Sequence, residues 1–176
     1  MRVFTAVPLP KEAKKLAGDL FKRTLPVHYV NTENLHITLN FFGELETDQA
    51  ANLRDLFVEV LRGKKSFPVE FDRIAKFRNQ IHMTLKPNLA LEGLQNQLEK
   101  EFSNAGYKFD HREFYSHVKI ANMHMDKVMN MNRKIENFPN EILSGLDFIA
   151  DRIVLYESKL LLHHAHHYPL VKINLR

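Results

Sequence analysis

The stretch ENLHITLNFFGE, residues 33 to 44, places polar side chains at every second position of an otherwise apolar run. This alternation predicts a β-strand, because residues i and i+2 of a strand face the same side. His36, Thr38 and Asn40 are therefore expected to share one face, while Phe41 belongs to the opposite face with its apolar neighbours. One face should pack into a core, and the other carries groups that can exchange protons or donate hydrogen bonds.

The composition is that of an ordinary globular protein with 44% hydrophobic and 26% charged residues among 176. The chain contains no cysteine, which excludes disulfides, thiolate metal sites and a cysteine nucleophile. The apolar runs are too short for a membrane span, and the first residues do not resemble a secretory signal. We therefore expect a cytoplasmic protein, and we also expect it to be a monomer. The formal charge of +4 mildly favours a phosphate-bearing partner.

The first part of the chain predicts the order strand, helix, strand, strand, helix. Apolar positions at helical spacing follow a short first strand, and a second helix opens at Thr47 and ends at Gly63. The predicted strands are 2–7, 27–30 and 35–42.

The second part repeats this theme loosely, with a helix over 89–105 that ends at Gly106. A short helix is expected at 125–137. The predicted strands are 67–77, 80–86, 112–123, 147–157, 159–163 and 168–175. No linker rich in glycine, proline or serine divides the chain. We therefore predict one α+β domain over residues 1–176, with two pseudo-symmetric lobes. Each lobe would be an antiparallel sheet with helices on its outer face, around a central groove.

Two further histidine motifs offer a partner for His36. HMTL (82–85) matches HITL better in residue identity, because it repeats the threonine as Thr84. HVKI (117–120) is the better match by position, because it follows a helix as HITL does. His82 is therefore weighed against His117 as the second functional histidine.

The sequence around these histidine motifs resembles that of a known family. VHYVNTENLHITLNFFGE (27–44) is similar to the first signature of the RNA 2′,3′-cyclic phosphodiesterases, also called 2′-5′ RNA ligases of the LigT/ThpR type, in the 2H phosphoesterase superfamily. RVFTAVPLP (2–10) resembles the opening strand of the family, and GYKFDHREFYSHVKIANM (106–123) resembles its second histidine region. IVLYESKLLLHHAHHYPLVKINL (153–175) resembles its closing strands.

The resemblance implies two H-x-T/S motifs that face each other across a groove. His36 and Thr38 fill the first motif. The second falls on His117 and Lys119, so lysine stands where the family has threonine or serine. An ammonium group can also donate hydrogen bonds to a phosphoryl oxygen, and it adds a positive charge. The resemblance thus implies that His36 and His117 are catalytic, and that Thr38 and Lys119 bind phosphate.

The implied reaction is metal-independent hydrolysis of an RNA 2′,3′-cyclic phosphate to a 2′-phosphate, together with weak reverse 2′-5′ ligation. In this scheme His36 is the acid and His117 the base, because a nearby cation disfavours a protonated His117. Two alternatives stay open because of Lys119. One is a phosphodiesterase for another cyclic or nucleotide phosphate, and the other is a catalytically impaired module that binds RNA or nucleotides. The expected partners are RNA ends or nucleotide cyclic phosphates, without a membrane and without a cofactor.

Further side chains are candidates for lining the groove. They are His82, Thr84, Phe42 and Tyr115, of which the two aromatic residues could stack on a base. Arg112, Lys86 and Arg78 are candidates for contacts with flanking phosphates. The cluster HHAHH (163–167) invites a metal site, but a solvated turn is favoured because adjacent hairpin residues face opposite sides and no acidic residue is next to them. No metal site is therefore predicted.

Overall fold

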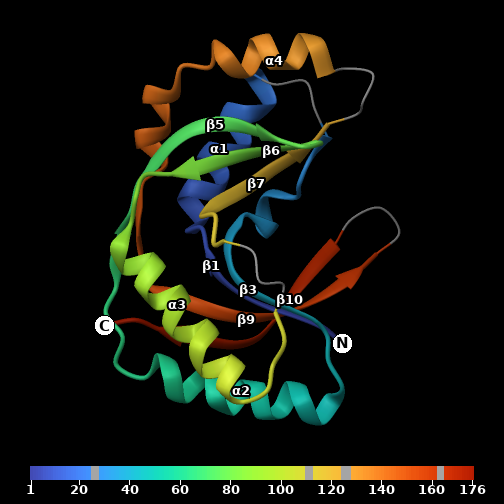
Figure 1. The fold of residues 1–176 in the computed structure, drawn as a ribbon. Coiled ribbons are helices and arrows are strands. Elements are labelled where there is room, and N and C mark those ends of the chain that lie inside the picture. Colours follow the sequence, from blue (N-terminus) through green and yellow to red (C-terminus); the bar gives the residue numbers. More distant parts are fainter. Residues whose placement is uncertain (25–27, 110–112, 124–127, 162–164) are drawn as a thin grey trace.

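The computed structural model describes residues 1–24, 28–109, 113–123, 128–161 and 165–176. These residues form an eight-stranded antiparallel sheet, a separate two-stranded ladder, and helices on the outside (Figure 1). Within these ranges, no helix combines the length and the apolar character needed to cross a membrane. The predicted α+β class is confirmed.

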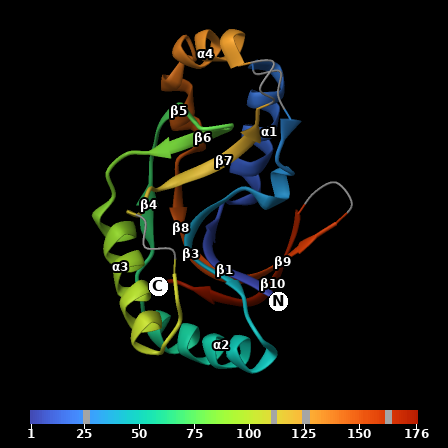
Figure 2. The ribbon, with the colours of Figure 1, turned by 45° about the vertical axis from the view of Figure 1, so that its right-hand side comes forward.

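The main sheet is divided where β3 meets β7. Its strand order is β10-β9-β1-β3-β7-β6-β5, and β2 pairs with β7. The pairing of β3 with β7 involves only one residue pair, Ile37 and Val118. The two halves of the sheet therefore spread apart from this contact as two lobes, one below and one above it in Figures 1 and 2.

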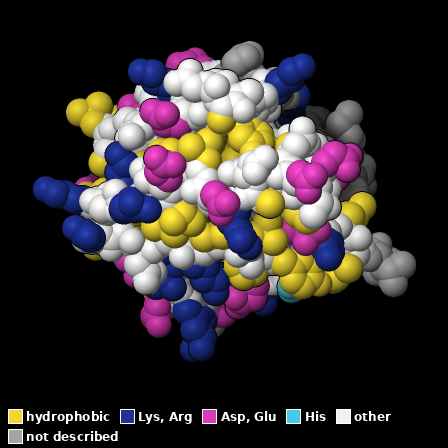
Figure 3. Space-filling view, turned by 90° about the horizontal axis from the view of Figure 1, so that it is seen from below, with side chains coloured by type: hydrophobic (Ala, Val, Ile, Leu, Met, Phe, Trp, Pro, Cys, Tyr) yellow, Lys and Arg dark blue, Asp and Glu magenta, His cyan; other side chains and the backbone are white. Residues whose placement is uncertain are grey.

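The first lobe contains four strands and two helices. Helices α2 (Thr47–Leu61) and α3 (Leu89–Asn104) cover its sheet from below and bury Phe57 and Phe102 completely. Gly63 and Gly106 follow these helices with φ of +73° and +89°, left-handed values that suit glycine at a helix end. The outer surface seen from this side carries charges of both signs (Figure 3). The strands are β1 (Arg2–Pro8), β3 (His36–Glu44), β9 (Arg152–Leu160) and β10 (Ala165–Asn174).

The second lobe takes its helices from both ends of the sequence. The ring of Phe21 on α1 (Lys11–Thr24) lies 6.2 Å from that of Phe138, which follows α4 (Val128–Glu136). The lobes are therefore not the two halves of the sequence, because the first helix packs with the later strands (Figure 2). The strands are β2 (His28–Tyr29), β5 (Phe71–Phe77), β6 (Gln80–Leu85) and β7 (His117–Asn122). The 3₁₀ helices are η1 (Thr32–Asn34) and η3 (Asn140–Leu146).

Several predicted strands differ from those observed. The predicted strand 67–77 is two strands, because β4 (Phe67–Val69) pairs with β8 (Phe148–Ala150) whereas β5 pairs with β6. The strand predicted at 112–123 is shorter, since β7 begins only at His117. Near the C-terminus, the predicted strand 147–157 is divided between β8 and β9, and β9 pairs with β10 in a long hairpin in place of the predicted strands 159–163 and 168–175.

The predicted alternation along β3 holds only as far as Leu39. The register between β1 and β3 shifts twice, and each shift adds one extra residue to β3. A bulge of this kind changes the face on which the following side chains lie. Asn40 is therefore buried, where its side-chain oxygen accepts a hydrogen bond from the Thr5 hydroxyl at 3.1 Å. Phe41 is turned outward, and Phe42 is packed in the core.

Candidate active site

His36 is held by hydrogen bonds on both ring nitrogens. Its Nδ1 lies 2.5 Å from the backbone carbonyl of Asn34, and its Nε2 lies 3.0 Å from the Thr38 hydroxyl. A carbonyl oxygen only accepts, so Nδ1 carries the proton of the neutral ring. Nε2 of the neutral ring then accepts from Thr38. This tautomer leaves Nε2 as the atom that can take up or deliver a catalytic proton.

The NTEN segment before His36 sets this orientation. Asn31 caps η1 by accepting a hydrogen bond from the backbone of Glu33, and this places the Asn34 carbonyl beside His36. The side chain of Asn34 also donates to the backbone carbonyl of Ala165 at 2.6 Å. The segment therefore ties the imidazole to the start of β10.

His117, at the start of β7, is oriented by the same kind of local hydrogen bond. Its Nδ1 lies 2.7 Å from the carbonyl of Tyr115, two residues earlier, as that of His36 lies near the carbonyl of Asn34. Both neutral rings therefore carry their proton on Nδ1 and leave Nε2 available. The two lobes present equivalent imidazoles.

The contact between β3 and β7 brings the two motifs together. Ile37 and Val118 are paired and fully buried, so their chain neighbours lie on the opposite face of the sheet. Extending this antiparallel register by one residue places Thr38 opposite His117, and His36 opposite Lys119. The structure thus gathers on one face the four residues that the sequence singled out.

Lys119 has an uncommitted ammonium group. The residue is half-buried, and within the described part of the chain its Nζ has neither a hydrogen bond nor an ion pair. Burial lowers the pKa of Lys119, and its charge in turn helps to lower the pKa of His117 and of His82. A buried cation without a partner is costly, so an anionic ligand here would be favoured.

His82 lies beside His117 and does not replace it. The two rings stack with centroids 4.0 Å apart and planes at 20°. His82 is 2% exposed, its Nε2 lies 2.8 Å from the side-chain oxygen of Gln80, and its Nδ1 has no hydrogen-bond partner among the described residues. Burial, with smaller effects of His117 and Lys119, lowers the pKa of His82 to about 3. The stack constrains the plane of the His117 ring, while His82 itself stays neutral.

Both imidazoles of the candidate pair are neutral in the unliganded protein. Burial is the main cause that lowers the pKa of His36 to about 4, and the charges of His167, Lys14 and His117 add to it. The hydrogen bond to Asn34 opposes this shift. Burial also lowers the pKa of His117. Either ring can act as a base, and the one that acts as an acid needs a bound anion to favour its protonated form.

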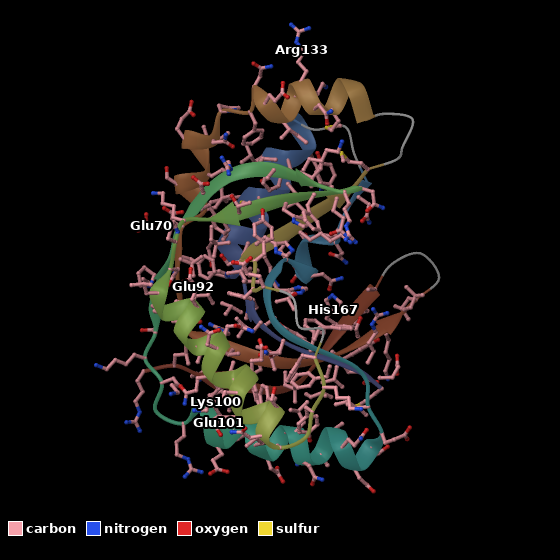
Figure 4. All side chains as sticks on the ribbon, viewed as in Figure 1. Glu70, Glu92, Lys100, Glu101, Arg133 and His167 are labelled. Carbon is pink, nitrogen blue, oxygen red and sulfur yellow. The ribbon has the colours of Figure 1, made fainter. Side chains whose placement is uncertain are left out.

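The environment of His36 includes residues that sequence reasoning missed. Its ring centroid lies 5.0 Å from that of Phe4, 5.3 Å from that of His167 and 6.4 Å from that of Tyr156. His167 belongs to β10 (Figure 4), so the expected solvated turn over 163–167 is wrong for this residue. Strand β10 begins early enough to carry His167 to the sheet face beside His36. No sequence signal marked Lys14, because a lysine on a helix is ordinary.

The histidine cluster gives no support for a metal site. Residues 163 and 164 lie outside the described residues. Within the described ranges, no group of three or more His, Asp or Glu side chains is placed to hold a metal ion.

A groove of about 920 Å³ lies beside His117, the second histidine of the pair. Thr38, His117 and His82 line it, together with three half-exposed aromatic rings. We call these rings, Phe41, Phe77 and Tyr115, the aromatic wall. Of the predicted groove-lining residues, His82 and Tyr115 do lie in the groove.

Two predicted groove residues lie elsewhere. Phe42 packs in the core with its ring 5.2 Å from that of Phe102, because the bulges in β3 exchange it with Phe41. Thr84 is buried, and its hydroxyl donates to the carbonyl of Arg73 at 3.2 Å.

Of the three cations predicted to contact flanking phosphates, one lies in the groove. Arg78 lines the groove, with its guanidinium 5.5 Å from the centre of the Phe77 ring. Lys86 forms an ion pair with Glu70 at 2.8 Å and does not line the groove. Arg112 lies outside the described residues.

Acidification is expected to destabilise the fold, because buried histidines are held neutral. The pKa of His36 is lowered to about 4 and that of His82 to about 3, from 6.5 in both cases. Between these lowered pKa values and 6.5, the unfolded chain therefore binds more protons than the folded chain. Stability is complete above about pH 6.5 and falls as the pH drops through this window.

His82→Phe is the matched variant for this prediction, since it keeps a stacked ring and removes the titrating group. Urea denaturation at several pH values measures the free energy of unfolding. Below about pH 6, we expect the free energy of unfolding to change less steeply with pH in the variant, by up to about 1.4 kcal/mol per pH unit. Equal slopes in the two proteins would contradict the prediction.

Comparison with known proteins places this arrangement in a family. A sequence model described as the 2′-5′ RNA ligase superfamily matches residues 9–160. The chain belongs to the 2′-5′ RNA ligase superfamily. This membership confirms the resemblance carried by the HITL and HVKI regions, which both lie within the matched residues.

Relatives in this superfamily cover most of the chain. It is 26% identical to the RNA 2′,3′-cyclic phosphodiesterase of Thermotoga maritima, over 91% of this chain and 88% of that protein. It is also 26% identical to the protein of the same name from Methanocaldococcus jannaschii, over 91% and 92%. These relatives are named as enzymes that act on RNA cyclic phosphates.

Solved structures share the fold of this chain. Escherichia coli LigT complexed with 3′-AMP matches with a TM-score of 0.81 and 20% identity, over 99% of this chain and 97% of that chain. The protein TT0787 of Thermus thermophilus matches with a TM-score of 0.80 and 19% identity, over 100% and 98%. At these identities the matches show the fold alone.

Proposed function

We propose that this protein hydrolyses 2′,3′-cyclic phosphates at RNA ends and leaves a 2′-phosphate. The observation that carries the proposal is the pair His36 and His117, which have the same tautomer on one sheet face where the two lobes meet. The names of the relatives support the choice of substrate. Because each lobe supplies one histidine, we also propose that residues 1–176 act as one bilobal domain.

The proposed step is an in-line displacement at phosphorus. Nε2 of His117 removes a proton from water as the water oxygen bonds to phosphorus. The bond from phosphorus to the 3′-oxygen breaks, and His36 delivers a proton from Nε2 to that oxygen. The products are a 3′-hydroxyl and a 2′-phosphate. A 5′-hydroxyl in place of water would give the 2′-5′ linkage of the reverse ligation.

Thr38 and Lys119 would stabilise the phosphoryl oxygens. The Thr38 hydroxyl donates to neutral His36 in the free protein. Once His36 carries a proton on Nε2, this nitrogen no longer accepts, so the hydroxyl hydrogen is free to turn toward a phosphoryl oxygen. The Lys119 ammonium supplies a full positive charge on the second strand. An anion between them would also raise the pKa of His36 and so prepare it as the acid.

The aromatic wall would hold the base of the terminal nucleotide. Phe41, Phe77 and Tyr115 are 42%, 48% and 46% exposed in a groove that also contains Thr38 and His117. Stacking of a base on an aromatic ring contributes about 1–3 kcal/mol and tolerates different bases. This arrangement favours a nucleotide over a small cyclic phosphate without a base.

The test is turnover of a short RNA that ends in a 2′,3′-cyclic phosphate, with the product separated from 2′-phosphate and 3′-phosphate standards. We expect the 2′-phosphate alone. A 3′-phosphate would reverse the assignment of acid and base. Binding of the RNA without turnover would favour the alternative of a catalytically impaired binding module.

A further inference from the structure

A second cavity, of about 380 Å³, lies where β1 ends and α1 begins. Four cationic side chains line it: Lys11, Lys14, Arg152 and Lys172. We call this cavity the basic pocket. It shares no lining residue with the groove of the aromatic wall.

The basic pocket lies next to His36. Pro8 lines the pocket and is the cross-strand partner of His36. Tyr156 also lines it, and its ring centroid lies 6.4 Å from that of His36. The charge of Lys14 reaches the imidazole, since it contributes to the lowered pKa of His36. A ligand group bound here would therefore lie close to His36.

Two cations of the basic pocket are already paired. Lys14 donates to the carbonyl of Glu33 at 2.6 Å and lies 3.8 Å from its carboxylate. Arg152 donates to both carboxylate oxygens of Asp151, at 2.7 and 2.9 Å. In each pair the carboxylate offsets the charge of the cation, so neither pair leaves much net charge in the pocket.

The other two cations are free to bind an anion. In the part of the chain described by the structure, the ammonium groups of Lys11 and Lys172 have no hydrogen-bond or ion-pair partner. Glu12 is the one lining carboxylate that is likewise unpaired in that part. The pocket therefore keeps a positive balance of one charge. Lys11 stands in the first turn of α1, where the helix dipole disfavours a cation. Helix stability therefore gives no reason for a lysine there.

We propose that the basic pocket binds the backbone phosphate on the 5′ side of the terminal nucleotide of the RNA. The strand would then place its base on the aromatic wall, its cyclic phosphate between the histidines, and its preceding phosphate against Lys11 and Lys172. This inference rests on the proposed function and refines its substrate. It makes an RNA strand a better substrate than a cyclic mononucleotide with a 5′-hydroxyl, which lacks that phosphate.

The test compares two substrates, a trinucleotide that ends in a 2′,3′-cyclic phosphate and a 2′,3′-cyclic mononucleotide. In the double variant Lys11→Gln/Lys172→Gln, we expect kcat/KM for the trinucleotide to fall roughly three- to tenfold. The value for the mononucleotide should stay within about twofold, because the catalytic groups are unchanged. The salt dependence for the trinucleotide should also weaken.

Lys65→Gln is the matched control, since it removes the charge of an exposed lysine outside both cavities. A loss in the control equal to that in the double variant, or an equal loss for both substrates, would overturn the inference. If the parent turns over neither substrate, the proposed function fails but the pocket can still be tested. Fluorescence anisotropy with a trinucleotide 3′-phosphate should then show weaker binding by the double variant than by the parent and Lys65→Gln. Equal binding by all three would overturn the inference.

Discussion

Replacing either His36 or His117 with alanine is expected to lower kcat for cyclic phosphate hydrolysis by about 10²- to 10⁴-fold. Each ring offers Nε2 to the same sheet face, and we expect neither His82 beside His117 nor His167 beside His36 to take over its proton transfer. His82 is unsuited to this role, because its Nε2 is hydrogen-bonded to Gln80 and its ring is buried against His117. Steady-state rates with a trinucleotide 2′,3′-cyclic phosphate measure the effect.

His166→Ala is the matched control, since the His166 ring packs on Tyr168 at 4.4 Å and lines neither cavity. It should turn over the substrate at nearly the parental rate. Retained activity in His117→Ala, together with lost activity in His82→Ala, would assign the second motif to HMTL and contradict our choice.

A modified substrate separates the acid from the base. If sulfur replaces the 3′-bridging oxygen, the leaving thiolate needs no proton. His36→Ala should then recover much of its lost rate with this substrate, whereas His117→Ala should not. The opposite pattern would exchange the two roles.

The pairing of these histidines could be predicted from sequence only in part. Alternation along β3 is a local property, so His36 and Thr38 were correctly placed on one face. His117 was preferred over His82 from the order of elements, from its spacing to His36 and from the family resemblance of its segment, and extending the register of Ile37 with Val118 places it across from Thr38. The stack of His82 on His117 depends on the pairing of β6 with β7, which no local pattern specifies.

Residues that reach the site from distant segments escaped sequence reasoning. Phe41 enters the groove only because a bulge at Leu39 shifts β3 against β1, and a bulge leaves no clear mark in a single sequence. His167 reaches His36 through the long β9–β10 hairpin, which the sequence divided differently. Lys14 influences the pKa of His36 from α1, a helix that packs with the second lobe although it directly follows the first strand.

The second large prediction concerns Lys119, which stands at the position where the family resemblance implies threonine or serine. Lys119→Ala is expected to lower kcat by about 10²- to 10³-fold, the usual cost of removing one donor that stabilises a developing oxyanion. Lys119→Thr should recover part of this loss, because its hydroxyl can donate to the phosphoryl oxygen. Lys65→Ala, which removes an exposed ammonium group elsewhere, should have little effect.

The pH profile gives an independent measure of the same role. Burial lowers the pKa of Lys119 below its usual 10.5, and only the protonated amine supplies the charge. Activity of the parent should therefore fall as the pH rises through that lowered pKa, and Lys119→Thr should lack this alkaline loss. Because the charge of Lys119 lowers the pKa of His117, both variants should also raise the pKa of His117 in an NMR titration. If Lys119→Ala stays fully active while the pKa of His117 rises, the ammonium lies near the imidazole but does not stabilise the reacting phosphate.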